Sequence, residues 1–190
     1  LVRPWLWPGE AHGILRPFLA VHSAGRGTGR FERGVRERLM VQHTAPPLAG
    51  FRVIESSLLG PAAITTHLAD LGAQVIKVES PSGDYIREMT WPIIDGVSLL
   101  HLHINRGKKS LTLDLKTDQG VEVYKDLVRG ADAVIEAMRP GSLARRGLGY
   151  EDLSAINPRI VFCNISGYGM TGPYQSLPAH GIAFDTWAGI

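Results

Sequence analysis

Five short apolar runs, rich in β-branched residues, alternate with segments of helical periodicity along most of the chain. The runs cover residues 51–55, 74–79, 110–115, 131–136 and 160–166. Apolar runs of this length between turn residues predict strands, and strands that alternate with helices predict a parallel sheet. We therefore expect a doubly wound α/β domain with helices on both faces of the sheet.

Helix signals separate the predicted strands. Capping residues, prolines and glycines predict one helix over residues 60–72 and another over 117–130, with shorter helical pieces over 141–146 and 151–156. Residues 80–109 read as one long connection. Because long loops are uncommon inside a compact domain unless they serve a function, we expect this connection to be functional.

The last predicted strand, residues 160–166, ends abruptly in glycines, and His180 follows within a turn-rich loop. Ligands of open α/β sheets bind outside the carboxyl ends of the strands, so we expect this strand to open into a functional loop. Cys163 is the single cysteine of the chain, which excludes an intramolecular disulfide. Its place in a predicted strand indicates a buried, reduced thiol.

Composition divides the chain near residue 45. Residues 1–45 hold seven arginines, no lysine and three glutamates, a formal charge of +4, and they lack a convincing period. We expect them to form a poorly ordered leader, and residues 46–190 to form one domain. The net charge of +2 does not call for nucleic acid, and no apolar run is long enough for a membrane helix, which needs roughly 18 residues. We expect a cytoplasmic protein.

Two basic clusters are candidate ligand sites. The first is the loop 105–110, with the sequence Asn-Arg-Gly-Lys-Lys-Ser, and the second comprises Arg139, Arg145 and Arg146. A dense basic loop can be a solvated charge run or a phosphate clamp, and its spacing alone does not decide between them. Two clusters on one nearly neutral domain favour an anionic small molecule. We expect both clusters to lie at the same edge of the sheet.

Other motifs point away from redox and metal chemistry. Gly167-x-Gly169-x-x-Gly172 matches the dinucleotide fingerprint in letters, but Pro173 and Pro178 oppose the long helix that the fingerprint needs. The histidines show no trusted metal spacing. We therefore expect neither a metal nor a nicotinamide or flavin cofactor. A lone histidine such as His180 is more often structural or exposed than catalytic.

Taken together, the motifs resemble the class III CoA-transferase family, which includes formyl-CoA transferase, carnitine CoA-transferase and α-methylacyl-CoA racemase. The resemblance runs through residues 48–55, 68–79, 105–110, 113–116, 139–141, 148–150, 157–159 and 167–173. Each segment alone is weak, but their order and spacing make the set specific. The resemblance implies a Rossmann-like large domain, incomplete here, in a homodimer of interlocked chains.

The family likeness also implies a coenzyme A site. By this similarity Asn105, Arg106, Lys108 and Lys109 bind CoA, together with the loop that carries Arg139 and Arg145. CoA serves as a substrate, with an acyl-CoA and a carboxylic acid as partners and no permanently bound cofactor. Two departures concern this site: Ser80 stands where many members carry an arginine, and the loop after the first strand is about two residues short.

In the transferases an aspartate carboxylate attacks the acyl-CoA thioester and an aspartyl-CoA intermediate forms. By the family pattern that aspartate lies beyond Ile190, so we expect an N-terminal CoA-binding part of a transferase of sulfur-containing groups, inactive alone. An alternative is an α-methylacyl-CoA racemase-like epimerase with His180 as acid or base. Gly181 replaces the aspartate that follows this histidine in racemases, which favours transfer. A CoA-binding module without turnover is the third possibility.

Overall fold

The computed structural model describes residues 45–178 and 181–189 of the chain. The predicted leader, residues 1–45, falls outside this part except for Ala45, and so does His180. Residues 46–190 form one compact unit. No helix in the described ranges is long and apolar enough to cross a membrane.

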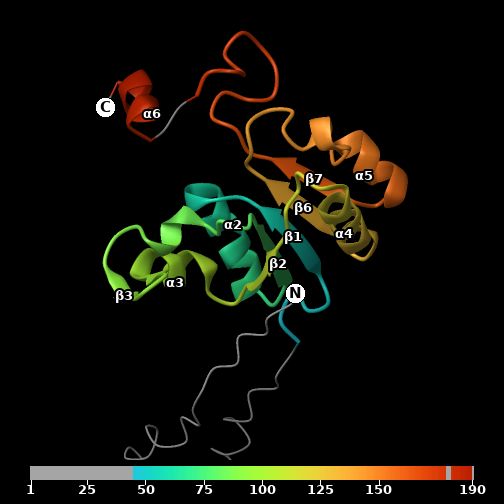
Figure 1. Ribbon diagram of the computed structural model, residues 1–190, viewed down its shortest axis with the longest axis horizontal. Helices are drawn as coiled ribbons and strands as arrows, with labels where there is room; N and C mark the ends of the chain where they lie inside the picture. The colour runs from blue at the N-terminus through green and yellow to red at the C-terminus, as the bar shows by residue number, and fades with distance from the viewer. Residues whose placement is uncertain (1–44, 179–180, 190) are drawn as a thin grey trace, which may run out of the picture. The chain divides into compact units, whose positions relative to one another are not determined.

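A single parallel sheet of five strands forms the centre of this unit (Figure 1). Its members are β1 (Arg52–Ser56), β2 (Gln74–Glu79), β5 (Lys109–Thr112), β6 (Ala133–Glu136) and β7 (Val161–Asn164). The strand order is β5-β2-β1-β6-β7, and every neighbouring pair is parallel. The α/β architecture predicted from the alternating runs is confirmed.

Helices cover both faces of the sheet because successive side chains of each strand point to opposite sides. On one face, Val53 of β1 packs in a cluster with Leu68 of α2 (Leu59–Asp70). On the other face, Ile54 packs with Tyr124 of α4 (Asp118–Arg129), and α5 (Tyr150–Ile156) adds Leu153 to the same cluster. The predicted placement of helices on both faces is thus also confirmed.

The connection predicted over residues 80–109 is largely folded, which corrects the expectation of a long loop. It contains a 3₁₀ turn at Tyr85–Arg87, the hairpin of β3 (Pro92–Ile94) and β4 (Val97–Ser98), and the helix α3 (Leu99–Asn105). The physical reason is a small core of its own, in which Ile86 and Ile104 are buried. Two further elements complete the described part: a 3₁₀ turn at Ala144–Arg146 and α6 (Gly181–Ala188).

The last strand of the sheet, β7, lies at an edge and not in the interior. Val161 is 58 % exposed, and Cys163 is also exposed. The prediction of a buried strand with a buried thiol is therefore wrong. An apolar run reads the same at the centre and at the edge of a sheet, so strand order decides which of its residues meet solvent.

Candidate functional site

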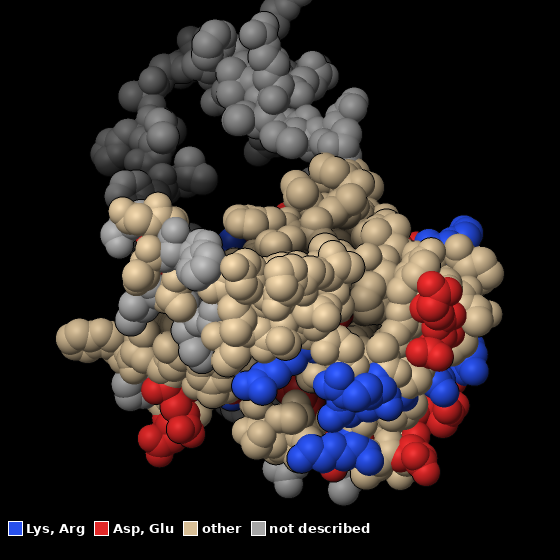
Figure 2. All heavy atoms as spheres, turned by 90° about the horizontal axis from the view of Figure 1, so that it is seen from above, with Lys and Arg blue, Asp and Glu red and all other residues tan. Residues whose placement is uncertain are grey.

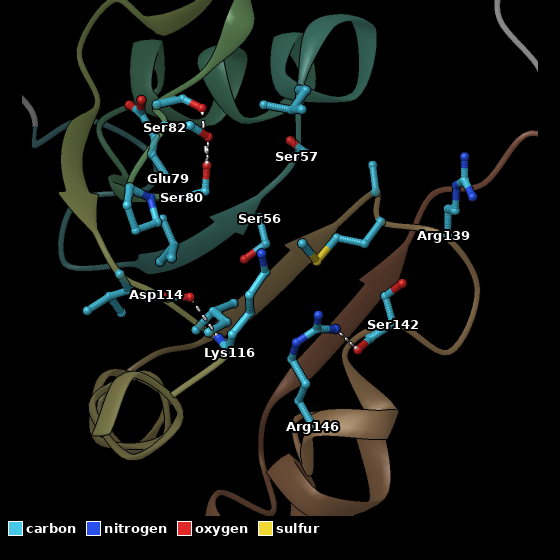
Figure 3. A pocket seen from close by; sticks show the side chains of 18 residues that line it. Ser56, Ser57, Glu79, Ser80, Ser82, Asp114, Lys116, Arg139, Ser142 and Arg146 are labelled. Atoms are coloured by element: carbon cyan, nitrogen blue, oxygen red, sulfur yellow. Dashed lines mark hydrogen bonds between the residues drawn. The ribbon is translucent and has the colours of Figure 1, made fainter. Parts of the chain in front are cut away.

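The strand order places a candidate site between β1 and β6, where the direction of strand addition reverses. Chain segments leave the carboxyl ends of these two strands in opposite directions, and open α/β sheets bind ligands at such points. A cavity of about 640 Å³ lies here, and segments that follow β1, β2, β5 and β6 line it (Figure 3). We call it the switch-point cavity.

Hydroxyl and cationic side chains dominate the polar lining of the switch-point cavity. The hydroxyls belong to Ser56, Ser57, Ser80, Ser82 and Ser142, and the cations to Lys116, Arg139 and Arg146. Figure 3 shows Lys116 and Arg146 near each other, while Arg139 lies further along the cavity. Within residues 45–178 and 181–189, none of these three cations forms an ion pair. Their charge is available to a ligand.

The two acids of the cavity wall do not neutralise these cations. Glu79 receives a bidentate contact from Arg87, with Nη2 2.8 Å from Oε1, and a hydrogen bond from Ser110 Oγ at 2.7 Å. Burial alone would raise the pKa of Glu79, but these two partners outweigh it and lower the pKa below its ordinary value. Asp114 Oδ1 accepts a hydrogen bond from the backbone N–H of Lys116, which shapes the loop after β5.

Two further hollows adjoin the same basic residues. One of about 700 Å³ shares Lys116 and Arg146 with the switch-point cavity and adds Arg145 and Lys125. Another of about 500 Å³ shares Arg139 and also includes Arg145. Lys and Arg side chains lie side by side along one stretch of the face drawn in Figure 2. The lining of the two hollows brings together Arg139, Arg145 and Arg146 at the carboxyl edge, the three residues of the second basic cluster.

The first basic cluster lies elsewhere. Residues 105–108 precede β5, whereas Arg139 follows β6, and in a parallel sheet these positions fall at opposite edges. Arg106 Nη2 is 2.5 Å from Asp70 Oδ2 at the carboxyl end of α2. The expectation that both clusters share one edge is therefore wrong, because a loop that precedes a parallel strand and a loop that follows one lie at opposite edges of the sheet.

The side chains of this loop also differ in what they can reach. The Lys108 side chain is 1 % exposed, and its Nζ lies 2.8 Å from Glu55 Oε2 and donates to the Ala62 carbonyl at 2.6 Å. Burial lowers the pKa of Lys108 below its ordinary value, although Glu55 opposes that effect. Asn105 Oδ1 accepts a further hydrogen bond from Lys108 at 3.3 Å. Lys109 is exposed on the edge strand β5 and stays a candidate ligand-binding residue.

Three further polar residues lie beneath the carboxyl edge and were missed by sequence analysis. Glu136 is 4 % exposed, and its Oε2 accepts from the backbone N–H of Met138 at 2.8 Å, while Asn164 Nδ2 donates to Oε1. Burial raises the pKa of Glu136, and the Met138 bond offsets only part of that rise. Tyr124 shares a 3.1 Å hydrogen bond with Ser56, and burial raises the Tyr124 pKa far above its ordinary value. Each of these residues lies in or beside an apolar stretch of the sequence, so the pattern does not indicate that it belongs to a polar site.

The raised pKa of Glu136 predicts that the stability of the fold depends on pH. Since its pKa is raised in the fold, its contribution is greatest at low pH and is lost as the pH rises through the folded value. The Glu136→Gln variant mimics the protonated acid. We expect the variant to unfold at higher urea concentration than the wild-type chain at about pH 8, with the difference vanishing below about pH 4. A wild-type chain more stable than the variant at the higher pH would contradict this reading.

Comparison with known proteins identifies the family. The sequence profile of CoA-transferase family III matches residues 48–190. Succinate–glutarate CoA-transferase of Agrobacterium fabrum is 46 % identical over 144 residues, which are 71 % of this chain and 36 % of that protein. Human succinyl-CoA:glutarate CoA-transferase is 41 % identical over 170 residues, covering 88 % of this chain and 38 % of that protein.

Solved structures agree with the sequence relatives. A hypothetical protein of Mycobacterium tuberculosis matches with a TM-score of 0.70 and 41 % identity, over 76 % of this chain and 40 % of that one. A CAIB/BAIF family protein of Brucella suis matches with a TM-score of 0.70 and 41 % identity, over 77 % and 40 %. The chain therefore spans about two-fifths of these relatives. The resemblance drawn from the motifs is confirmed, and the chain belongs to CoA-transferase family III.

Proposed function

We propose that this chain supplies the coenzyme A-binding part of an enzyme that moves CoA from an acyl-CoA to a carboxylic acid. The observation that supports it best is the switch-point cavity with three cations that lack ion-pair partners in the described part of the chain. Relatives named as CoA-transferases act on acids such as glutarate and oxalate, according to their names. These names favour a carboxylate acceptor for the whole protein.

The chemistry of the cavity suits the nucleotide end of CoA. CoA carries a pyrophosphate and a 3′-phosphate, and phosphate oxygens form strong charge-assisted hydrogen bonds with arginine and lysine. Lys116 and Arg146 border both the switch-point cavity and the hollow beside it, so they can contact phosphates in either. Arg139 and Arg145 complete this proposed phosphate site. The role of Asn105, Arg106, Lys108 and Lys109 in CoA binding stays a separate prediction.

The proposed reaction proceeds through nucleophilic catalysis. An aspartate carboxylate attacks the thioester carbonyl, CoA leaves as its thiolate, and the resulting mixed anhydride is attacked by that thiolate to give an aspartyl-CoA thioester. The acceptor acid then takes the CoA by the reverse sequence. In this proposal the nucleophile comes from a segment that the relatives have beyond the matched region, and two chains pair as a homodimer. The chain alone is then expected to bind CoA without turnover.

Calorimetric titration of the 190-residue chain with CoA tests the proposal. We expect saturable binding with a dissociation constant between about 1 μM and about 1 mM, the range in which enzyme substrates commonly bind. Dephospho-CoA, which lacks the 3′-phosphate, should bind about tenfold more weakly, since one charge-assisted contact contributes roughly 1.5–3 kcal/mol. Absence of binding by CoA at about 1 mM would overturn the assignment of the cavity.

A further inference from the structure

Four buried charges lie on the α2 side of the sheet, beneath the switch-point cavity. They are Glu55, Lys77, Asp84 and Lys108, with side chains that are each 1 % exposed or less. We call them the buried charge cluster. Two carboxylates and two ammonium groups balance in formal charge, and the cluster draws them from β1, β2, the loop after β2 and the segment before β5.

Lys77 is the bridging member of the cluster. Its Nζ is 3.0 Å from Glu55 Oε1, 3.0 Å from Asp84 Oδ2, and 2.6 Å from the Ser57 carbonyl oxygen, to which it donates. An ammonium group has three protons. Lys77 donates hydrogen bonds to Glu55 Oε1 and to the Ser57 carbonyl oxygen, and its contact with Asp84 Oδ2 is an ion pair. The contacts reach three different segments: the end of β1, the loop after β1 and the loop after β2.

Two of these segments form adjoining walls of the switch-point cavity. Ser57 and its neighbours line the cavity directly, and so do residues 80–83, which come immediately before Asp84. Asp84 holds its own loop through Oδ1, which accepts from the backbone N–H of Ile86 at 3.1 Å. One ammonium group therefore contacts both walls. Lys108 serves a different purpose, since it joins Glu55 to the Ala62 carbonyl in α2.

Stability alone gives a poor reason for such a cluster. Burying ions costs several kcal/mol per group, and well-packed apolar residues in their place are often as stable or more so. What a buried ion pair in contact with several segments provides is a defined geometry. Resting on the proposed function, we propose that Lys77 is a positioning residue, which holds the loops after β1 and β2 at the distance that CoA binding requires.

The test compares two variants that keep the charges balanced or nearly so. Lys77→Met with Asp84→Asn removes one charge of each sign and leaves Glu55 paired with Lys108. Asp84→Asn alone keeps the Lys77 contacts with Glu55 and Ser57. Amide hydrogen exchange is measured by mass spectrometry on peptides that cover residues 56–59, 80–84 and 118–129. Calorimetry then gives the CoA dissociation constant of each variant.

The expected pattern is specific to positioning. In the double variant both cavity loops should exchange at least about tenfold faster, while α4 keeps its wild-type rate, and CoA affinity should fall about tenfold or more. In Asp84→Asn only residues 80–84 should exchange faster. The matched control is Arg129→Met with Asp126→Asn, an exposed ion pair on α4, which should change neither loop exchange nor affinity.

Each outcome decides the proposal. Wild-type exchange in both loops of the double variant, or faster exchange with unchanged CoA affinity, would overturn the positioning role. If the double variant does not fold, the Asp84→Asn variant decides the test. Equally faster amide exchange in both cavity loops, or unchanged exchange in both, would then reject the role of Lys77 as a bridge between them. If the wild-type chain binds no CoA, the proposed function fails. Amide hydrogen exchange in the two cavity loops then tests on its own whether Lys77 holds the two walls.

Discussion

The Glu55→Ala variant is expected to lose about 3–5 kcal/mol of unfolding free energy, since removing one partner of a buried pair leaves uncompensated charge. The Glu55 carboxylate contacts Lys77 at 3.0 Å, Lys108 at 2.8 Å and Ser57 Oγ at 3.0 Å, and it is fully buried. Alanine would leave two buried ammonium groups with a single carboxylate. Because small domains have only about 5–15 kcal/mol in total, such a loss threatens folding itself.

Urea unfolding at neutral pH measures this effect. The matched control is Glu122→Ala, which removes a carboxylate that is 62 % exposed and paired with Lys125 at 2.9 Å on α4. An exposed pair of this kind contributes only about 0.2–1 kcal/mol. Equal losses in the two variants would show that the buried charge cluster has no special weight in the stability of the domain.

CoA affinity is expected to fall about 10- to 100-fold when Lys116 and Arg146 are both replaced by alanine. Each charge-assisted contact with a phosphate is worth roughly 1.5–3 kcal/mol, and partial exposure of both side chains reduces that figure. Because the two residues border the switch-point cavity and the adjoining hollow, the loss should be smaller for dephospho-CoA if they contact the 3′-phosphate. Calorimetry with both ligands measures the difference.

Two comparisons make this experiment decisive. Arg129→Ala with Arg159→Ala removes the same formal charge from exposed positions away from the cavity, and it should leave affinity unchanged. Arg106→Ala with Lys109→Ala tests the site that the sequence predicted before β5. If that variant loses CoA binding and the Lys116 and Arg146 variant retains it, the ligand binds at the amino edge of the sheet and the cavity assignment is wrong.

The sequence was sufficient for the architecture of the domain. Alternation of apolar runs with helical segments depends on local periodicity, and this is why β1, β2 and β6 appear within two residues of their predicted bounds. The family was also readable, because it rests on many short motifs in a fixed order. The hairpin of β3 and β4 and the helix α3 were missed, since short elements around their own small core leave little periodic signal.

The site was only half readable. Arg139, Arg145 and Arg146 follow a strand directly, so their place at the carboxyl edge follows from topology. Lys108 looked like a surface cation because its neighbours in sequence are polar, yet its partner Glu55 stands far earlier in the chain. Lys116 lies within a family motif, but a single lysine in the sequence does not indicate a binding site. Such pairings depend on the three-dimensional fold, which the spacing of residues does not encode.

The contact between Lys77 and the loop after β1 ends on a peptide oxygen, which every amino acid carries. A substitution at residue 57 would therefore alter the chemistry presented to the ligand and keep this anchoring bond. The side chains of this wall can in this way differ between related proteins while the underlying support stays the same.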